Sequence, residues 1–158
     1  DRGHQIPSAD RLVTREANEQ TFYYTNMTPQ IGKGMNQHIW QKLETAVRGW
    51  SSNIDTLYVV TGAMPTTPEN TTISYTQDND GKQIAVPKYY FKALCRINRA
   101  TGEAYTIAFK LENKAYPNNE PYMNHTLSVA ELERMTGFVF FPMIREQDKQ
   151  AYDKSKWN

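Results

Sequence analysis

The chain has 158 residues, a formal net charge of +1 at pH 7 and a single cysteine. This length is enough to bury one hydrophobic core, so we expect a single domain over residues 1–158. The near-neutral charge excludes a strongly basic surface, so a positive groove would depend on where individual arginines lie. No apolar segment approaches the ~18 residues that a membrane-spanning helix requires. One cysteine excludes an internal disulfide, and the apolar neighbours of Cys95 predict a buried thiol.

The first fifty residues predict two helices. Residues 5–20 are expected to form a loop and then a short helical stretch near Asp10–Glu19. The aromatic run Phe22–Tyr24 predicts a strand, which the turn Met27–Gln30 would close. A second helix is expected from Asn36 to Gly49, because apolar residues recur at spacings of four, four and three on one face: Ile39, Leu43, Val47 and Trp50.

The rest of the chain predicts mainly strands. Leu57–Thr61 is apolar and β-branched, which indicates a buried strand ending at Gly62. The elements expected next are an edge strand at Thr71–Thr76, a turn at Asp80-Gly81, and a hairpin of Tyr89–Asn98 and Ala104–Glu112. An exposed loop over 113–126 should follow, and then a helix between the capping box Ser128–Glu131 and Gly137. The chain is expected to end in an apolar segment at Phe138–Phe141 and a charged tail over 145–157 that is compatible with a helix. Without a regular βαβ alternation, this order predicts an α+β fold with a mainly antiparallel sheet.

The predicted helix from Asn36 also carries a polar stripe, in which Asn36, Trp40, Glu44 and Arg48 recur every four residues. A neutral amide oxygen suits Mg²⁺, which keeps most of its waters and binds phosphate oxygens. Asn36 and Glu44 start ~12 Å apart along the helix axis. We therefore expect the metal on Asn36, with Glu44 holding a metal-bound water. Arg48 would offset charge on a phosphate, whereas Trp40 is expected to pack in the core.

A second polar group opens the chain as Asp1-Arg2-Gly3-His4. The imidazole of His4, with an ordinary pKa of about 6.5, can accept a proton from water at neutral pH. The guanidinium of Arg2 can bind two phosphate oxygens at once, and Gly3 would let the backbone turn sharply between them. A base, an amide ligand, a carboxylate and two arginines are the groups that a single-metal phosphodiester hydrolase needs.

Each of these side chains also has a structural interpretation. The alternatives are a surface histidine for His4, an ion pair of Arg2 with Asp1 or Glu16, a helix N-cap for Asn36, and an i, i+4 pair of Glu44 with Arg48. The occurrence of all four groups in one chain favours the catalytic interpretation.

Three segments carry a resemblance to a known family: Asp1-Arg2-Gly3-His4, the run Thr25–Gln30, and Met35-Asn36-Gln37-x-x-Trp40-x-x-Leu43-Glu44. Their order resembles the DNA/RNA non-specific endonuclease family, the Serratia nuclease and endonuclease G type within the ββα-metal (His-Me finger) nucleases. The likeness continues in Val59–Gly62, Val86–Lys92 and Glu131–Pro142, so it spans nearly the whole chain.

The resemblance implies a central sheet with the ββα-metal unit on one face, and cleavage of DNA and RNA that leaves 5′-phosphate ends. It implies Mg²⁺ as the cofactor, with Mn²⁺ as a substitute. Asn26 matches a family position near the active site, where a supporting or phosphate-binding role is expected. Family members carry a strand-rich portion ahead of the motif, so the chain is expected to be the C-terminal part of the family domain. A secreted or periplasmic location is also expected.

Two other hypotheses follow from the same residues. One is a catalytically impaired module that binds nucleic acid or a protein on a nuclease scaffold. The other is the nuclease domain of a toxin or effector, which differs only in its biological setting. Besides DNA and RNA, the partners considered are a second copy of the chain and an N-terminal fragment of the same protein.

Overall fold

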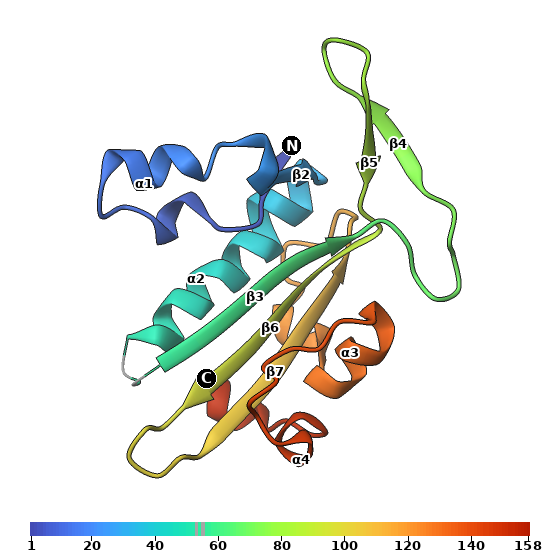
Figure 1. Cartoon of the computed structure of the whole chain (residues 1–158). Helices are drawn as coiled ribbons and strands as arrows, with labels where there is room; N and C mark the ends of the chain where they lie inside the picture. Colours follow the sequence, from blue (N-terminus) through green and yellow to red (C-terminus); the bar gives the residue numbers. More distant parts are fainter. Residues whose placement is uncertain (53, 55) are drawn as a thin grey trace.

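The computed structural model describes residues 1–52, 54 and 56–158. A four-stranded antiparallel sheet, in the order β3-β6-β7-β8, forms its centre. These strands are β3 (Thr56–Met64), β6 (Tyr89–Ile97), β7 (Ala104–Glu112) and β8 (Thr126–Leu127). Helix α2 (Gln41–Ser51) and helix α3 (Val129–Thr136) lie on opposite sides of the sheet (Figure 1). The predicted α+β class with a mainly antiparallel sheet is confirmed.

Two hydrophobic clusters follow from the alternation of side chains along β6 and β7. Tyr90 and Leu94 pack with Leu43 and Val47 of α2, whereas Phe91 belongs to the cluster under α3. The thiol of Cys95 is buried in β6, as expected, and burial raises its pKa to about 11. The sheet therefore presents one face to α2, and this is the face that bears on the candidate site.

The hairpin of β6 and β7 and the helix α3 confirm the sequence predictions closely. Ala93 lies opposite Ala108, and each strand starts and ends within one residue of the expected bounds. The hydroxyl of Ser128 accepts a hydrogen bond of 3.1 Å from the backbone N–H of Glu131. Gly137 follows α3 with a φ of 75°, the left-handed conformation that glycine adopts without strain.

The segment before residue 32 differs from the prediction. Strand β1 (Arg2–His4) pairs with β2 (Met27–Pro29), in the residues expected to form a turn, while the expected strand at Phe22–Tyr24 is absent there. Helix α1 (Arg15–Gln20) is shorter than expected. Local patterns missed β2 because its strand conformation depends on pairing with β1, which lies more than twenty residues earlier.

The helix that carries the polar stripe begins close to its expected start. Gly32–Trp40 is a π-type segment that is interrupted by non-helical backbone at Lys33 and Gly34 and then continues directly into α2. The prediction that Gly49 ends this helix is wrong, because α2 continues to Ser51. A glycine inside a helix costs only about 1 kcal/mol relative to alanine, which packing of the apolar stripe overrides.

Strand β3 is an edge strand rather than the buried strand expected at Leu57–Thr61. Among the described strands it pairs only with β6, and Tyr58, Val59 and Val60 are 49%, 42% and 37% exposed. A β-branched apolar run indicates a strand but does not distinguish a central strand from an edge strand, since it carries no information about the number of neighbours.

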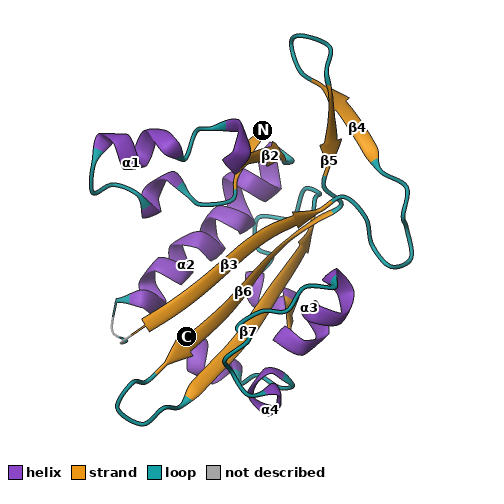
Figure 2. Ribbon diagram, viewed as in Figure 1, coloured by secondary structure: helices purple, strands orange, loops and turns teal. Residues whose placement is uncertain are grey.

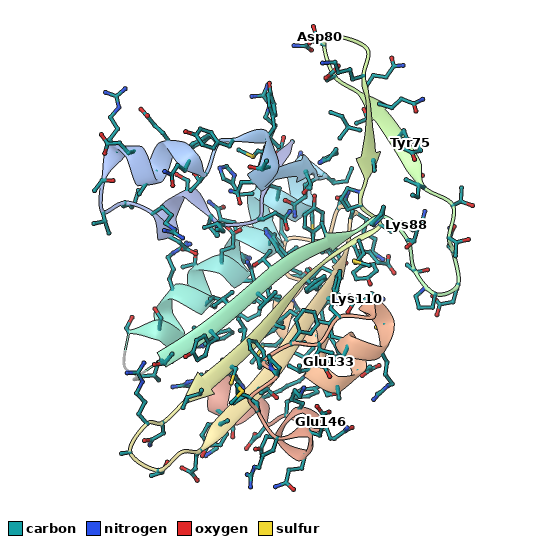
Figure 3. The ribbon with its side chains drawn as sticks, in the orientation of Figure 1. Tyr75, Asp80, Lys88, Lys110, Glu133 and Glu146 are labelled. Carbon is teal, nitrogen blue, oxygen red and sulfur yellow. The ribbon has the colours of Figure 1, made fainter. Side chains whose placement is uncertain are left out.

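A separate hairpin, β4 (Ser74–Gln77) with β5 (Gln83–Val86), projects from the body of the molecule (Figure 2). Asp80 lies at its tip, followed by Gly81 with a φ of 78°, so the predicted turn is confirmed (Figure 3). The remaining elements are α4 (Glu146–Lys149) and single turns of 3-10 helix at Ser8–Asp10, Tyr24–Asn26, Tyr122–His125 and Lys154–Trp157. In the apolar segment Phe138–Phe141 only Phe140 is buried. None of the helices described has the length and apolar character to cross a bilayer.

Candidate active site

The start of β1 lies against the start of the polar-stripe helix. The carboxylate of Asp1 accepts hydrogen bonds from the side-chain amides of Asn36, at 3.1 Å, and Gln37, at 2.7 Å. His4 follows three residues later, so its backbone lies within ~10 Å of the backbone of Asp1, the reach of an extended chain. The structure thus brings the opening tetrapeptide beside the helix that carries the amide ligand candidate.

Gly3 serves a different purpose from the one expected. It lies within β1 rather than in a sharp turn. A Cβ atom at this position would lie 2.3 Å from the side-chain oxygen of Gln30, closer than real Cβ contacts. The glycine is required by this close approach, so the predicted turn is wrong.

His4 is partly buried, with its ring edge-on to Phe22 at a centroid distance of 5.0 Å. Its Nε2 atom is buried and has no hydrogen-bond partner among the described residues. Burial lowers the pKa of this imidazole below its ordinary value. The ring is therefore neutral at neutral pH, which is the form that can accept a proton from water.

The side-chain amide of Asn36 is oriented by Asp1. A carboxylate only accepts hydrogen bonds, so the NH₂ end of the amide must face it. The amide oxygen is then left unused by the described residues, and it suits a hard cation such as Mg²⁺. Asn36 is not an N-cap, because its own backbone N–H already donates to the backbone carbonyl of Ile31 within the π-type segment.

No group of three or more His, Cys, Asp or Glu side chains able to hold a metal occurs within the described residues. A cation at Asn36 would accordingly have few protein ligands and keep most of its waters, as Mg²⁺ commonly does. The residues present fit such an ion.

Glu44 and Arg48 project from α2 but do not pair with each other. Instead, a guanidinium N–H of Arg48 donates to the carboxylate of Asp10 at 3.0 Å, so the alternative of an i, i+4 ion pair is wrong. Burial raises the pKa of Glu44, and the charges of Lys92 and Arg48 oppose this shift. Trp40, on the same stripe, is fully buried and packs in the core as expected.

A cavity of about 300 Å³ opens beside Glu44. It is lined by Gln5, Ile6, Pro7, Asp10, Arg11, Glu44, Val47, Val59, Thr61 and Lys92. The chain immediately after His4 forms one wall and β3 with β6 forms another. Glu44 thus lines the same cavity as the buried Lys92.

Asn26 and Arg2 have contrasting surroundings. The amide of Asn26 makes three bonds to backbone, accepting from the N–H of Ile6 and donating to the carbonyls of Ile6 and Thr21, at 2.8–2.9 Å. These bonds join the segments after β1 and before β2, which favours the supporting role over contact with phosphate. The side chain of Arg2 is exposed, and the alternative ion pair with Asp1 or Glu16 does not occur in the described part of the chain.

Three residues near the site were missed by the sequence analysis: Asp1, Asp10 and Lys92. Asp1 adjoins the catalytic candidates in the sequence, but only the fold shows which amide it orients. Lys92 had a signal, since it is the one charged residue among the first seven of the otherwise apolar β6. A lysine in such a strand either reaches solvent in spite of its apolar neighbours or is a buried charge with a function. Asp10 had no comparable signal.

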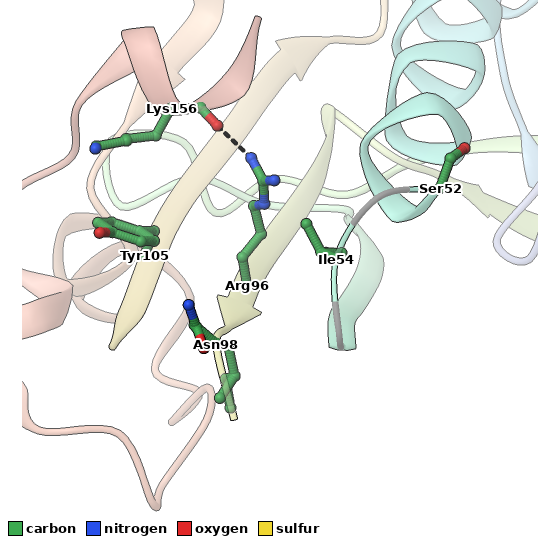
Figure 4. A pocket seen from close by; sticks show the side chains of 7 residues that line it. Ser52, Ile54, Arg96, Asn98, Tyr105 and Lys156 are labelled. Carbon is green, nitrogen blue, oxygen red and sulfur yellow. Dashed lines mark hydrogen bonds between the residues drawn. The ribbon is translucent and has the colours of Figure 1, made fainter. Parts of the chain in front are cut away.

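Another cavity, of about 600 Å³, lies at the C-terminal end of α2 and is lined by residues that include Ser52, Arg96, Tyr105 and Lys156 (Figure 4). Arg96 donates to the backbone carbonyl of Lys156 at its edge. This end of the helix lies roughly 24 Å from Asn36 along the axis. The cavity is therefore separate from the candidate site.

Comparison with known proteins decides the family. The model of the family described as DNA/RNA non-specific endonuclease matches residues 1–147. The chain belongs to this family. It is 34% identical over 146 residues to Nuclease C1 of Cunninghamella echinulata var. echinulata, a match that covers 91% of this chain and 58% of the relative. It is 32% identical over 143 residues to Nuclease 1, mitochondrial, of Schizosaccharomyces pombe, covering 87% of this chain and 44% of the relative.

A solved structure supports the fold assignment of this endonuclease family member. A chain in the crystal structure of the EndoG/EndoGI complex superposes with a TM-score of 0.78 at 24% identity, covering 96% of this chain and 62% of that chain. The chain spans about half the length of the relatives it matches. The prediction of a secreted or periplasmic location is wrong: the S. pombe relative and several others are mitochondrial by name.

Proposed function

We propose that the protein is a Mg²⁺-dependent endonuclease that hydrolyses phosphodiester bonds of DNA and RNA with little sequence preference. The observation that carries this proposal is the contact of Asp1 with Asn36, which joins the segment of the base His4 to the helix of the ligand Asn36. Little base recognition is expected, because the candidate groups all address phosphate, metal or water.

In the proposed reaction, His4 takes a proton from a water molecule whose oxygen attacks the phosphorus. The bond between phosphorus and the 3′-oxygen breaks, and the departing oxygen takes a proton from a water that Glu44 holds; the hydroxide left behind is neutralised by the proton that His4 then releases to solvent. Arg2 and Arg48 bind the phosphate oxygens and stabilise the negative charge that develops on them. The products carry a 5′-phosphate and a 3′-hydroxyl.

Asn36 is the residue that would hold the cation through its amide oxygen, and Glu44 follows two turns later on the same stripe of the helix. When bound, Mg²⁺ would offset the negative charge on the phosphate and on the departing oxygen. Asp1 holds the NH₂ end of the amide, so the amide oxygen would be available to a cation. Mn²⁺ shares the preference for oxygen ligands and is expected to replace Mg²⁺.

Replacing His4 with alanine tests the general base. The expected result is a loss of ~10²- to 10⁴-fold in kcat, with nucleic-acid affinity nearly unchanged, because a base acts only in the chemical step. Affinity is measured by fluorescence anisotropy in EDTA, and kcat by cleavage of a labelled duplex. His125→Ala serves as the control, since His125 bonds to Glu120 instead. An equal loss of binding and rate would make His4 a substrate clamp.

A plasmid-nicking assay tests the metal and separates the proposal from the binding-module hypothesis. EDTA should abolish nicking, and Mg²⁺ or Mn²⁺ should restore it. Cleavage that continues in EDTA would remove Asn36 from its role. Binding of nucleic acid without cleavage at any Mg²⁺ concentration would favour the catalytically impaired module.

A further inference from the structure

Lys92 is a buried cation that the proposed reaction does not use. It lies on β6, is 1% exposed, and faces α2. Its ammonium group donates to the hydroxyl of Thr61, its cross-strand partner on β3, at 2.8 Å. An ammonium has three N–H donors, and a buried charge with so few hydrogen bonds needs a nearby opposite charge.

The side chains around Lys92 lead to Glu44. The ammonium lies 4.8 Å from the ring centroid of Trp40, which precedes Glu44 by one turn on the same stripe of the helix. Lys92 and Glu44 line the same cavity. The other carboxylate in this cavity, Asp10, is already bonded to Arg48 at 3.0 Å. Asp10 also favours the charged form of Lys92, but less than Glu44 does, so Glu44 is the main carboxylate that offsets the charge of Lys92.

The electrostatic influence between the two groups is reciprocal. After burial, Lys92 is the largest influence on the pKa of Glu44, and it lowers that pKa. Burial lowers the pKa of Lys92 to about 8, and Glu44 is the largest charge that opposes this shift. A pKa of about 8 leaves most of the Lys92 ammonium charged at pH 7.

We propose that Lys92 is a positioning residue: its ammonium offsets the charge of the half-buried Glu44 carboxylate and so holds Glu44 in place as a hydrogen-bond acceptor. The catalytic consequence rests on the proposed function, whereas the electrostatic coupling of Lys92 with Glu44, called the pairing below, concerns the folded chain alone. Lys92 acts through Glu44 and does not itself contact substrate.

A double-mutant cycle with Lys92→Met, Glu44→Gln and the combined variant tests the pairing without any need for activity. Unfolding in urea gives the unfolding equilibrium constant of each protein. We expect Lys92→Met to raise this constant ~10-fold more in the parent than in the Glu44→Gln background, because only the parent is left with an uncompensated carboxylate. Equal effects in the two backgrounds would overturn the pairing. If Lys92→Met does not fold, Lys92→Gln removes the charge while keeping a hydrogen-bond donor for Thr61.

The same four proteins test the catalytic consequence. In the parent, Lys92→Met should lower kcat ~10- to 100-fold with little change in KM, and it should cost less than ~3-fold in the Glu44→Gln background. A loss of kcat that is equal in both backgrounds would make Lys92 merely structural and overturn the proposal. If the parent shows no cleavage but the unfolding cycle is coupled, the proposed function fails and the pairing stands.

Lys110→Met is the matched control. Lys110 lies on β7 with its ammonium 4.9 Å from the ring centroid of Tyr89, so it makes a similar contact with an aromatic ring. It belongs to the opposite face of the sheet, on the side of α3 (Figure 3). We expect no coupling with Glu44→Gln and an unchanged kcat. Coupling as large as that of Lys92 would show a general charge effect and overturn the specific pairing.

Discussion

At the scale of single residues, the chemistry of the candidate site depends on which end of an amide faces a cation. Asp1 can only accept hydrogen bonds, so it holds the NH₂ group of Asn36 and leaves the amide oxygen on the other side. Gln37 donates to the same carboxylate oxygen and keeps it in place. The orientation of the proposed ligand thus comes from a residue that would not touch the metal.

This arrangement predicts that Asp1→Ala weakens metal use. Without the carboxylate the amide is free to rotate, so the Mg²⁺ concentration for half-maximal cleavage should rise by ~10- to 100-fold, the usual effect of losing a group that orients a ligand. The measurement is a Mg²⁺ titration of nicking rate. Gln37→Leu is the control, because it keeps the bond between Asp1 and Asn36 and should change the Mg²⁺ requirement less. An unchanged requirement in Asp1→Ala would contradict the role given to Asp1.

The sequence allowed the candidate catalytic residues to be named but not their partners. His4, Asn36 and Glu44 could be nominated because imidazole, amide and carboxylate have defined chemistry at defined spacings. The bond of Arg48 to Asp10 could not be predicted, since 38 residues separate them and a closer carboxylate, Glu44, was available. Partners of this kind depend on the path of the chain, which local patterns do not encode.

At the scale of elements, two glycines in the polar-stripe helix have opposite roles. Gly34 has a φ of 83°, and a Cβ atom there would lie 3.0 Å from the backbone N and O of Tyr116. Gly49 lies inside α2, and a Cβ atom there would meet nothing within 4 Å. The first glycine sets the start of the helix, whereas the second contributes no contact.

Alanine substitutions should therefore change stability in opposite directions. Gly34→Ala is expected to lower the free energy of unfolding by about 1–3 kcal/mol, through backbone strain and the clash with Tyr116. Gly49→Ala should raise it by about 1 kcal/mol, because alanine favours the helix. Urea unfolding of both variants measures the two effects side by side. A stabilising Gly34→Ala would show that the left-handed backbone at this position is not required.

Elements were predictable where local pattern and tertiary context agree. The hairpin of β6 and β7 and the cap of α3 follow from alternation, turn residues and Ser128, which act within a few residues. β2 and the exposed edge of β3 were mispredicted, because each depends on which strands lie beside it. The π-type segment at Gly32–Trp40 also had no local signal beyond its glycines.

At the scale of the whole molecule, the buried ammonium of Lys92 links folding to pH. Its pKa is about 8 in the folded chain against an ordinary 10.5. Between these values the unfolded chain still binds the proton that the folded chain has lost, so stability rises with pH across this window. Below pH 8 Lys92 is charged in both states, so a further fall in pH no longer changes its contribution to the free energy of unfolding. The thiol of Cys95 acts in the opposite sense above pH 9, because its folded pKa is raised to about 11 from 9.0.

The contribution of Lys92 is isolated by subtracting the unfolding free energy of Lys92→Met from that of the parent at each pH. Cys95 and all other groups titrate in both proteins and largely cancel in this difference. We expect the parent to gain ~3 kcal/mol relative to the variant between pH 7.5 and pH 10.5, which follows from the 2.5-unit separation of the two pKa values. A difference that stays flat over this range would mean that Lys92 keeps its ordinary pKa in the folded protein. The hydrogen bond to Thr61 and the neighbouring carboxylates would then stabilise the Lys92 ammonium enough to cancel the cost of its burial.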